Sequence, residues 1–139
     1  MSDVVFVDTN ILVYAHDADA GVKRDRAIEK LRSLWDSDAG RLSVQVLQEL
    51  YVNITRKIST PVARSTAREI VNIYGAWVRE PTTLDTVTRA IDITALAQIS
   101  FWDALIVASA EQAGATELYS EDLNDGQIVA GVKIVNPLS

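Results

Sequence analysis

The chain has 139 residues, of which 48% are hydrophobic and 23% charged, and it contains no cysteine and one histidine. These proportions are typical of a folded globular protein of one domain, and they exclude the disordered, collagen-like and disulfide-rich classes. With His16 as the only imidazole, we expect neither a zinc centre nor a Ser-His-Asp triad. Any chemistry must therefore depend on oxygen atoms.

The net charge of −6 is unevenly distributed. Residues 1–68 carry ten basic and nine acidic side chains, a net of +1, whereas residues 69–139 carry three and ten, a net of −7. A basic run usually marks a solvated helix face, and it can also bind a nucleic-acid backbone. The densest basic run comprises Lys23, Arg24, Arg26, Lys30 and Arg32.

The sequence carries no secretory signal pattern, and no apolar run approaches the roughly 20 residues that span a bilayer. We therefore expect a cytoplasmic protein that has no membrane partner.

The first half of the chain predicts one buried strand followed by helices. The run VVFV at 4–7 is apolar and rich in β-branched residues, as in a strand covered on both faces. Helical periodicity then covers about 23–37, 45–58 and 62–75. In the second of these, the apolar stripe comprises Leu47, Leu50, Tyr51 and Ile54.

The second half alternates helices and strands. A helix is predicted near 86–98, and another follows Ser100, a potential N-cap, and ends before Gly114. Short strands are expected at 116–120 and 132–136. Because this alternation favours parallel pairing, we predict an α/β fold with a central parallel sheet and ligands at the carboxyl ends of its strands.

Four acidic residues stand where they can converge at that edge: Asp8, Glu49, Asp103 and Asp122. Each also has a structural explanation. Asp8 can cap the next helix, and Glu49 lies opposite the apolar stripe of 45–58 and can be an exposed charge. Asp103 can complete a capping box with the serine three residues before it, and Asp122 can belong to a polar loop.

The joint interpretation is stronger because Asp103 is embedded in the apolar run SFWDALIVASA, where an unpaired carboxylate is costly. Carboxylates gathered at one edge repel one another, and a divalent cation offsets that repulsion. Oxygen ligands favour one or two Mg²⁺ or Mn²⁺ ions. Thr9, Asn10 and Ser120 would hold the acids by hydrogen bonds, although Thr9 and Asn10 fit local capping equally well.

The segments VFVDTNILVYA, LQELYVNI, SFWDALIVASA and LYSEDLNDG resemble, in order, the motifs of PIN-domain nucleases, particularly the VapC-type toxins of bacterial toxin–antitoxin pairs. This resemblance implies one PIN-like domain over 1–139, built as a three-layer α/β/α sandwich around a parallel sheet. It places Asp8, Glu49, Asp103 and Asp122 on the family's acidic quartet, and Thr9, Asn10 and Ser120 on its polar positions. The motif around Glu49 is short, and Glu121 or Asp125 could share or replace the role of Asp122.

The resemblance implies a metal-dependent endoribonuclease that hydrolyses RNA phosphodiester bonds, with Asp8 and Asp103 as primary ligands. Single-stranded or looped RNA is the expected substrate. Its backbone would contact basic side chains, the candidates being Lys23, Arg24, Arg26, Arg56 and Lys57. A homodimer and a small antitoxin partner are also implied, and the antitoxin could silence the site by inserting an arginine or lysine among the acids.

Two other functions fit parts of the pattern. A non-catalytic PIN-like module would bind RNA or protein with the same fold. A receiver-type signalling domain also gathers aspartates around Mg²⁺ at strand ends, but such domains resemble a pair of acids after the first strand and a lysine before a late proline. Here Asp8-Thr9 and VNPL stand at those places.

Overall fold

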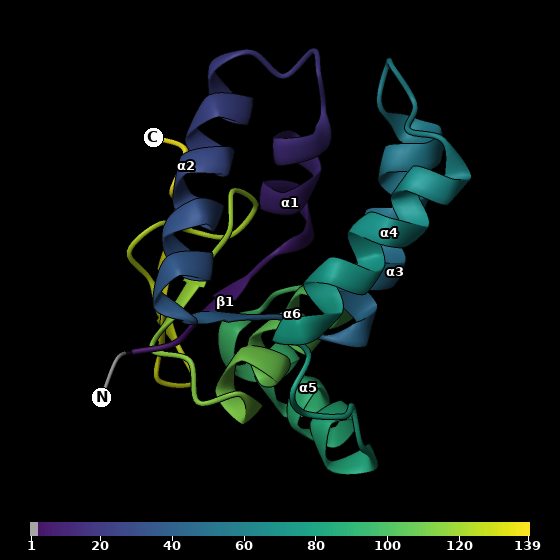
Figure 1. Ribbon diagram of the computed structural model, residues 1–139. Helices are drawn as coiled ribbons and strands as arrows, with labels where there is room; N and C mark the ends of the chain where they lie inside the picture. The colour runs from purple at the N-terminus through teal and green to yellow at the C-terminus, as the bar shows by residue number, and fades with distance from the viewer. Residues whose placement is uncertain (1–2) are drawn as a thin grey trace.

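The computed structural model describes residues 3–139, in which helices surround one five-stranded sheet (Figure 1). The strands are β1 (Val5–Val7), β2 (Gly40–Arg41), β3 (Glu117–Tyr119), β4 (Ile128–Val129) and β5 (Val132–Val135). Their order is β2-β1-β3-β5-β4; β4 is antiparallel to β5, and every other pair is parallel. The predicted α/β sandwich with a central parallel sheet is confirmed.

Strand β1, which lies between β2 and β3, fixes the position of the sheet's carboxyl edge. Its three residues are buried because strands lie on both sides of it and helices cover it, which explains the uninterrupted apolar run. Val7 lies opposite Tyr119 of β3. The backbone N–H of Asp8 then donates to the carbonyl of Tyr119 at 2.9 Å. Asp8 and Ser120 therefore leave neighbouring strands at the same edge.

The first half supplies two pairs of helices. The first pair is α1 (Thr9–His16) and α2 (Val22–Ser37), and the second is α3 (Val44–Val52) and α4 (Arg64–Tyr74). The predicted helix at 45–58 is divided, because the π-helical turn Asn53–Lys57 follows α3, and α4 likewise ends in a 3₁₀ turn at Gly75–Trp77. In Figure 1 the second pair stands beside the first as a separate hairpin.

The second half contributes α5 (Leu84–Ala97) and α6 (Phe101–Gln112). The hydroxyl of Ser100 accepts the backbone N–H of Asp103 at 3.1 Å, and Gly114 follows the helix with a positive φ of 74°. The predicted cap and helix end are both confirmed. Every residue from 104 to 110 is buried, so α6 is the central helix of this half.

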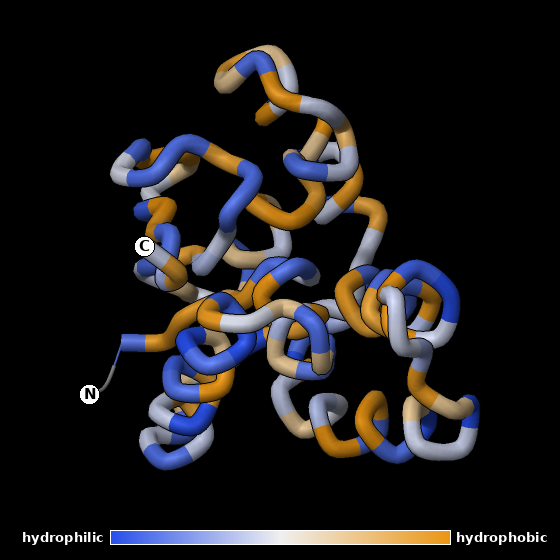
Figure 2. The backbone as a smooth tube through the Cα atoms, turned by 90° about the horizontal axis from the view of Figure 1, so that it is seen from above, coloured by the Kyte–Doolittle hydropathy of each residue, from blue (hydrophilic) through white to orange (hydrophobic). Residues whose placement is uncertain are grey.

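Apolar side chains of both halves form one core. Figure 2 shows hydrophilic and hydrophobic segments alternating around most of the helices, as expected for amphipathic helices packed on a core. Within residues 3–139, no single helix is both long and apolar enough to cross a bilayer. Only α5 and α6 together reach that length and composition, and they are bent by 115°.

Candidate active site

One small pocket at the carboxyl end of β1 is lined by acidic side chains from four segments of the chain. Asp8 follows β1, Glu49 comes from α3, Asp103 from the first turn of α6, and Asp122 from the loop after β3. The pocket has a volume of about 120 Å³. Its remaining lining residues are Thr9, Asn10, Gln45, Asn53, Trp102 and Ile106. The structure thus brings together the four acids that the sequence singled out.

Asp8 is the most buried of the four acids, with 6% of its surface exposed. One carboxylate oxygen accepts the backbone N–H of Thr9 at 2.7 Å, and the other accepts the hydroxyl of Ser120 at 2.9 Å. Burial raises the pKa of Asp8 to about 6 in spite of these bonds, and repulsion from Asp122 and Glu49 adds to the rise. Asp8 therefore caps α1 and also faces the pocket.

Glu49 reaches the pocket from the polar side of α3. Its Oε1 accepts the hydroxyl of Thr9 at 2.7 Å. Gln45, Glu49 and Asn53 are spaced by four residues, so they lie on one face of the helix, and all three line the pocket. The buried stripe of this helix, however, is Val46, Leu50 and Ile54. Leu50 and Ile54 of the predicted stripe are thus confirmed as buried, whereas Leu47 and Tyr51 are half-buried, packed against the core and lining a groove toward α4.

Asp122 is held by an amide from the opposite wall of the pocket. Asn10 donates its side-chain N–H to Oδ2 of Asp122 at 2.6 Å, and the backbone N–H of Asp122 donates to the hydroxyl of Ser120 at 3.2 Å. Burial raises the pKa of Asp122, and repulsion from Asp103 and Glu121 adds to it. Asn10 thus contacts one of the acids, whereas Thr9 and Ser120 contact two each.

Asp103 stands apart, because its carboxylate has no hydrogen-bond partner within the described part of the chain. Ser100 caps α6, but the reciprocal bond of a capping box, from the side chain of Asp103 back to the backbone of Ser100, is not formed. The capping-box explanation of this acid is therefore only half correct. The carboxylate faces the pocket, where it is available for a ligand.

The two neighbouring acids of the 120–125 segment do not line the pocket. Both oxygens of Glu121 are engaged outside it, one by the hydroxyl of Tyr14 at 2.5 Å and the other by the ammonium of Lys23 at 2.6 Å. Asp125 accepts the backbone N–H of Asn136 at 2.9 Å. The geometry therefore favours Asp122 over either neighbour.

The predicted RNA-contacting residues fall into two groups. Lys23 is paired with Glu121, and Arg26 donates to the backbone carbonyl of Leu138. The other three are exposed, Arg24 on α2 and the pair Arg56 and Lys57 in the π-helical turn that continues α3.

The potential metal ligands of the pocket are suited to a hard divalent cation, because they are four carboxylates, with no imidazole or thiolate among them. Within residues 3–139, no three acidic or histidine side chains are gathered closely enough to form a ready-made metal site. Burial is the main cause of the raised pKa values of Asp8 and Asp122, and repulsion from nearby acids adds to both. A bound cation would remove that repulsion, so the residues fit such an ion in chemistry and in location.

Sequence reasoning missed part of the pocket wall. Gln45 and Asn53 could have been found from their spacing of four residues on either side of Glu49. Trp102 also lines the pocket, and it is 63% exposed. Because Trp102 directly precedes Asp103 in the first turn of a helix, the sequence could have indicated that it lies beside the pocket.

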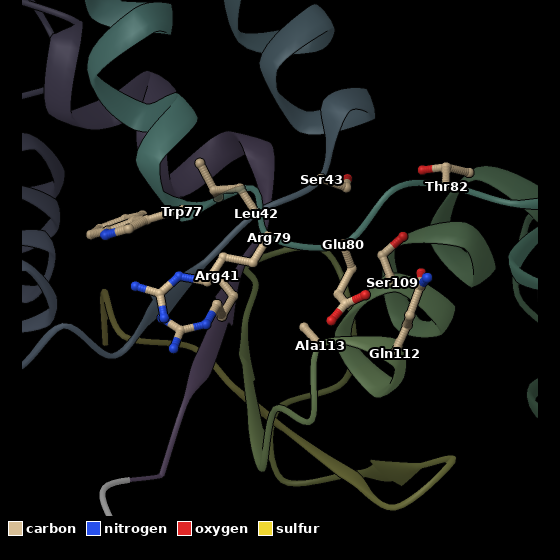
Figure 3. Close-up of a pocket in the computed structure, with 10 residues that line it drawn as sticks. All are labelled: Arg41, Leu42, Ser43, Trp77, Arg79, Glu80, Thr82, Ser109, Gln112 and Ala113. Atoms are coloured by element: carbon tan, nitrogen blue, oxygen red, sulfur yellow. The ribbon is translucent and has the colours of Figure 1, made fainter.

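A second pocket, of about 100 Å³, lies between β2, the segment after Trp77 and the end of α6 (Figure 3). Arg79 is paired with Asp38 at 2.9 Å, and Arg41 donates to the backbone carbonyls of Asp38 and Gly40. Figure 3 shows the two guanidinium groups side by side and the carboxylate of Glu80 extending toward α6. This pocket holds charges of both signs, so it lacks the acidic excess that distinguishes the first.

An α/β fold with an acidic pocket at the carboxyl edge of its parallel strands is the architecture of metal-dependent hydrolases as well as of other Mg²⁺-binding domains. The match of the sequence to a family model shows the family. Residues 5–125 match the model of the PIN domain family, and the chain belongs to this family. No curated protein matches the sequence at a significant level.

Solved structures share this fold over most of their length. The toxin VapC20 of Mycobacterium tuberculosis, described as cleaving the sarcin–ricin loop, is 24% identical over 85% of this chain and 89% of its own, with a TM-score of 0.62. A toxin–antitoxin complex from Klebsiella pneumoniae contains a chain that is 21% identical, with 97% and 98% covered and a TM-score of 0.68. A chain of VapBC2 from Rickettsia felis, solved on a DNA fragment from its promoter, is 16% identical, with 94% and 96% covered and a TM-score of 0.61.

Proposed function

We propose that this chain is a Mg²⁺- or Mn²⁺-dependent endoribonuclease and the toxin of a toxin–antitoxin pair. The observation that carries the proposal is the meeting of Asp8, Glu49, Asp103 and Asp122 in one pocket, from segments as far apart as residues 8 and 122. Four carboxylates that only repelled one another would be a cost to folding, so their gathering is best explained by a ligand of opposite charge. PIN family membership supports this choice.

In this proposal, Asp8 and Asp103 hold one or two cations directly, and Glu49 and Asp122 hold them directly or through water. A bound cation supplies charge neutralisation at the phosphate and lowers the pKa of the attacking water. Glu49 or Asp122 assists in removing the proton of that water. Thr9, Asn10 and Ser120 fix the acids by the hydrogen bonds described above.

RNA in single-stranded or looped form is the proposed substrate, because a splayed strand can bring one phosphate to a pocket of this size. The chain is acidic overall, so binding RNA requires local positive charge. Bound cations supply part of it. The exposed Arg24, Arg56 and Lys57 are proposed to supply the rest by contacting the RNA backbone. Lys23 and Arg26, also predicted as contacts, are engaged within the chain.

Cleavage of RNA by the purified chain, its arrest by EDTA and its loss in D8N and D103N test the proposal. D36N is the matched control, because Asp36 is exposed on α2 and lies outside the pocket. Equal cleavage by D8N, D103N and the wild type would indicate a contaminating nuclease. Absence of cleavage in a folded wild type that binds RNA would instead support the alternative, a non-catalytic PIN-like binding module.

A small antitoxin and a second copy of the chain are the proposed partners. The structural neighbour from Klebsiella pneumoniae is a toxin–antitoxin complex, and the one from Rickettsia felis is VapBC2 bound to promoter DNA, which supports the first. A basic side chain of the antitoxin is proposed to enter the acidic pocket. Size-exclusion chromatography of the chain with the product of its neighbouring gene tests the complex, and sedimentation equilibrium of the chain alone tests the homodimer.

A further inference from the structure

Two residues of α1, one helical turn apart, bind two consecutive residues of the segment after β3. Asn10 donates to Oδ2 of Asp122 at 2.6 Å, and Tyr14 donates its hydroxyl to Oε1 of Glu121 at 2.5 Å. Residues four apart lie on the same face of a helix, so these two contacts run side by side between the same two segments. The inner contact, from Asn10, binds Asp122, which lines the pocket. The outer contact, from Tyr14, binds Glu121, which does not.

Lys23 completes the outer contact from α2. Its ammonium lies 2.6 Å from Oε2 of Glu121, 3.5 Å from the hydroxyl of Tyr14 and 4.9 Å from the centre of the Tyr14 ring. Both oxygens of Glu121 are therefore occupied on the side of α1 and α2. The side chain of Glu121 is 22% exposed and that of Lys23 is 49% exposed, so the pair is partly shielded from water.

We propose that Tyr14, Lys23 and Glu121 form a clamp that positions Asp122 at the acidic pocket and keeps the carboxylate of Glu121 out of it. The proposal rests on the proposed function, since it assigns these residues to the support of that site. None of the three lines the pocket, so they act through Asp122 as positioning residues.

The clamp counteracts electrostatic repulsion in the segment that follows β3. Asp122 shares the pocket with Asp103 and directly follows Glu121, so two like charges lie close to its carboxylate and oppose its placement there. Asn10 holds the carboxylate of Asp122 in the pocket. The hydroxyl of Ser120 holds the backbone beside it, since it accepts the N–H groups of Asp122 and Leu123 at 3.2 and 3.4 Å. Pairing Glu121 with Lys23 neutralises one repelling charge, and the Tyr14 bond fixes the residue beside Asp122.

A different role for Glu121, as a cation ligand that replaces Asp122, makes the opposite prediction. If Glu121 were a ligand, Tyr14 and Lys23 would compete with the cation for it. Removing either would then strengthen cation binding. In a clamp, removing Tyr14, Lys23 or Glu121 weakens cation binding in each case.

The test measures Mn²⁺ binding by titration calorimetry and amide hydrogen exchange of residues 120–126 in metal-free protein. The variants are Y14F, K23Q, E121A and the double variant Y14F/E121A. E111Q is the matched control, because Glu111 forms the partly exposed pair with Arg89 between α5 and α6, away from the pocket. Y14F keeps the aromatic ring and K23Q changes an exposed side chain, so both are chosen to preserve the fold, which thermal unfolding checks.

We expect Y14F and E121A to weaken Mn²⁺ binding by about 3- to 10-fold, the size of one hydrogen bond, and to accelerate exchange in 120–126. The double variant should be no worse than E121A, because both changes remove the same contact. Higher Mn²⁺ concentrations should restore cleavage in Y14F and leave D103N inactive.

Wild-type exchange and wild-type Mn²⁺ affinity in Y14F and K23Q would overturn the clamp, and so would tighter Mn²⁺ binding. Failure of the proposed function gives a different result, namely no RNA cleavage by the wild type. The exchange measurement needs neither metal nor RNA, so the clamp is tested even in that case.

Discussion

Ser120 donates its hydroxyl to Oδ2 of Asp8 at 2.9 Å, although 112 residues separate them in the chain. The contact joins the ends of β1 and β3, and it lies entirely inside the protein, since Ser120 has no exposed surface. The hydroxyl oxygen of Ser120 also accepts the backbone N–H of Asp122. One hydroxyl therefore connects the most buried acid of the pocket with the segment that carries another.

The variant S120A should lower the free energy of unfolding by about 1–3 kcal/mol, because it leaves the buried carboxylate of Asp8 without one of its two donors. Urea unfolding at pH 7 measures the change. S37A is the control, because Ser37 is exposed and its hydroxyl donates to carbonyls of its own helix. It should change stability by no more than about 0.5 kcal/mol. Equal stability of S120A and the wild type would show that the bond contributes nothing.

The stability of the metal-free protein should depend on pH through Asp8. The pKa of Asp8 is raised from 3.8 to about 6 in the folded chain, mainly by burial. A raised pKa means that the folded state holds the proton more tightly than the unfolded state. The stability from this group is therefore complete below about pH 4 and is lost as the pH rises through 6, on the order of 3 kcal/mol.

The variant D8N isolates this contribution, because asparagine does not titrate. The difference in unfolding free energy between D8N and the wild type should shift in favour of D8N between pH 4 and pH 6.5 and then stay constant. Urea unfolding in EDTA at several pH values measures it. A difference that does not change across this range would mean that Asp8 titrates normally in the folded protein.

If the proposed cation site is correct, Mn²⁺ should stabilise the folded chain, because the carboxylates are gathered in the folded state and not in the unfolded one. At 100 times the dissociation constant the gain is about 2.7 kcal/mol. The gain should increase as the pH rises through 6, since protons compete with the cation for Asp8. Thermal unfolding with and without Mn²⁺ measures it. D103N should lose most of the gain, whereas D36N should keep it, and a gain of the same size in both would place the cation elsewhere.

The gathering of Asp8 and Asp122 could be predicted because each follows a strand, and parallel strands end at the same edge. The helix α6 was equally clear, since Ser100 and Gly114 mark its ends chemically. These features depend on helix caps, turns and apolar runs. Each of these is formed by residues that are close in the sequence, so it can be recognised from the sequence alone.

The missed features depend on contacts between distant residues or on very short segments. β2 and β4 have two residues each, too few to show any alternation. The helix α1 is mostly apolar, so its sequence shows no alternation of polar and apolar residues from which its ends could be predicted. Periodicity showed that Glu49 leaves the apolar stripe, but only packing on α1 turns it toward Thr9. The bond from Tyr14 to Glu121 spans 107 residues and had no signal in the sequence.

Gly40 in the edge strand β2 provides a last prediction, about the packing of the core around Trp77. A Cβ on this residue would lie 2.5 Å from the ring of Trp77, which is 1% exposed and stacked on Trp35 at 4.2 Å between ring centres. Because the indole is packed on both sides, G40A should cost about 1–3 kcal/mol. G75A is the control: Gly75 has a helical φ of −54° and open space at its Cβ. It should be neutral or stabilise by up to about 1 kcal/mol. Urea unfolding followed by tryptophan fluorescence measures both, and a G40A protein as stable as G75A would mean that the indole moves aside without cost.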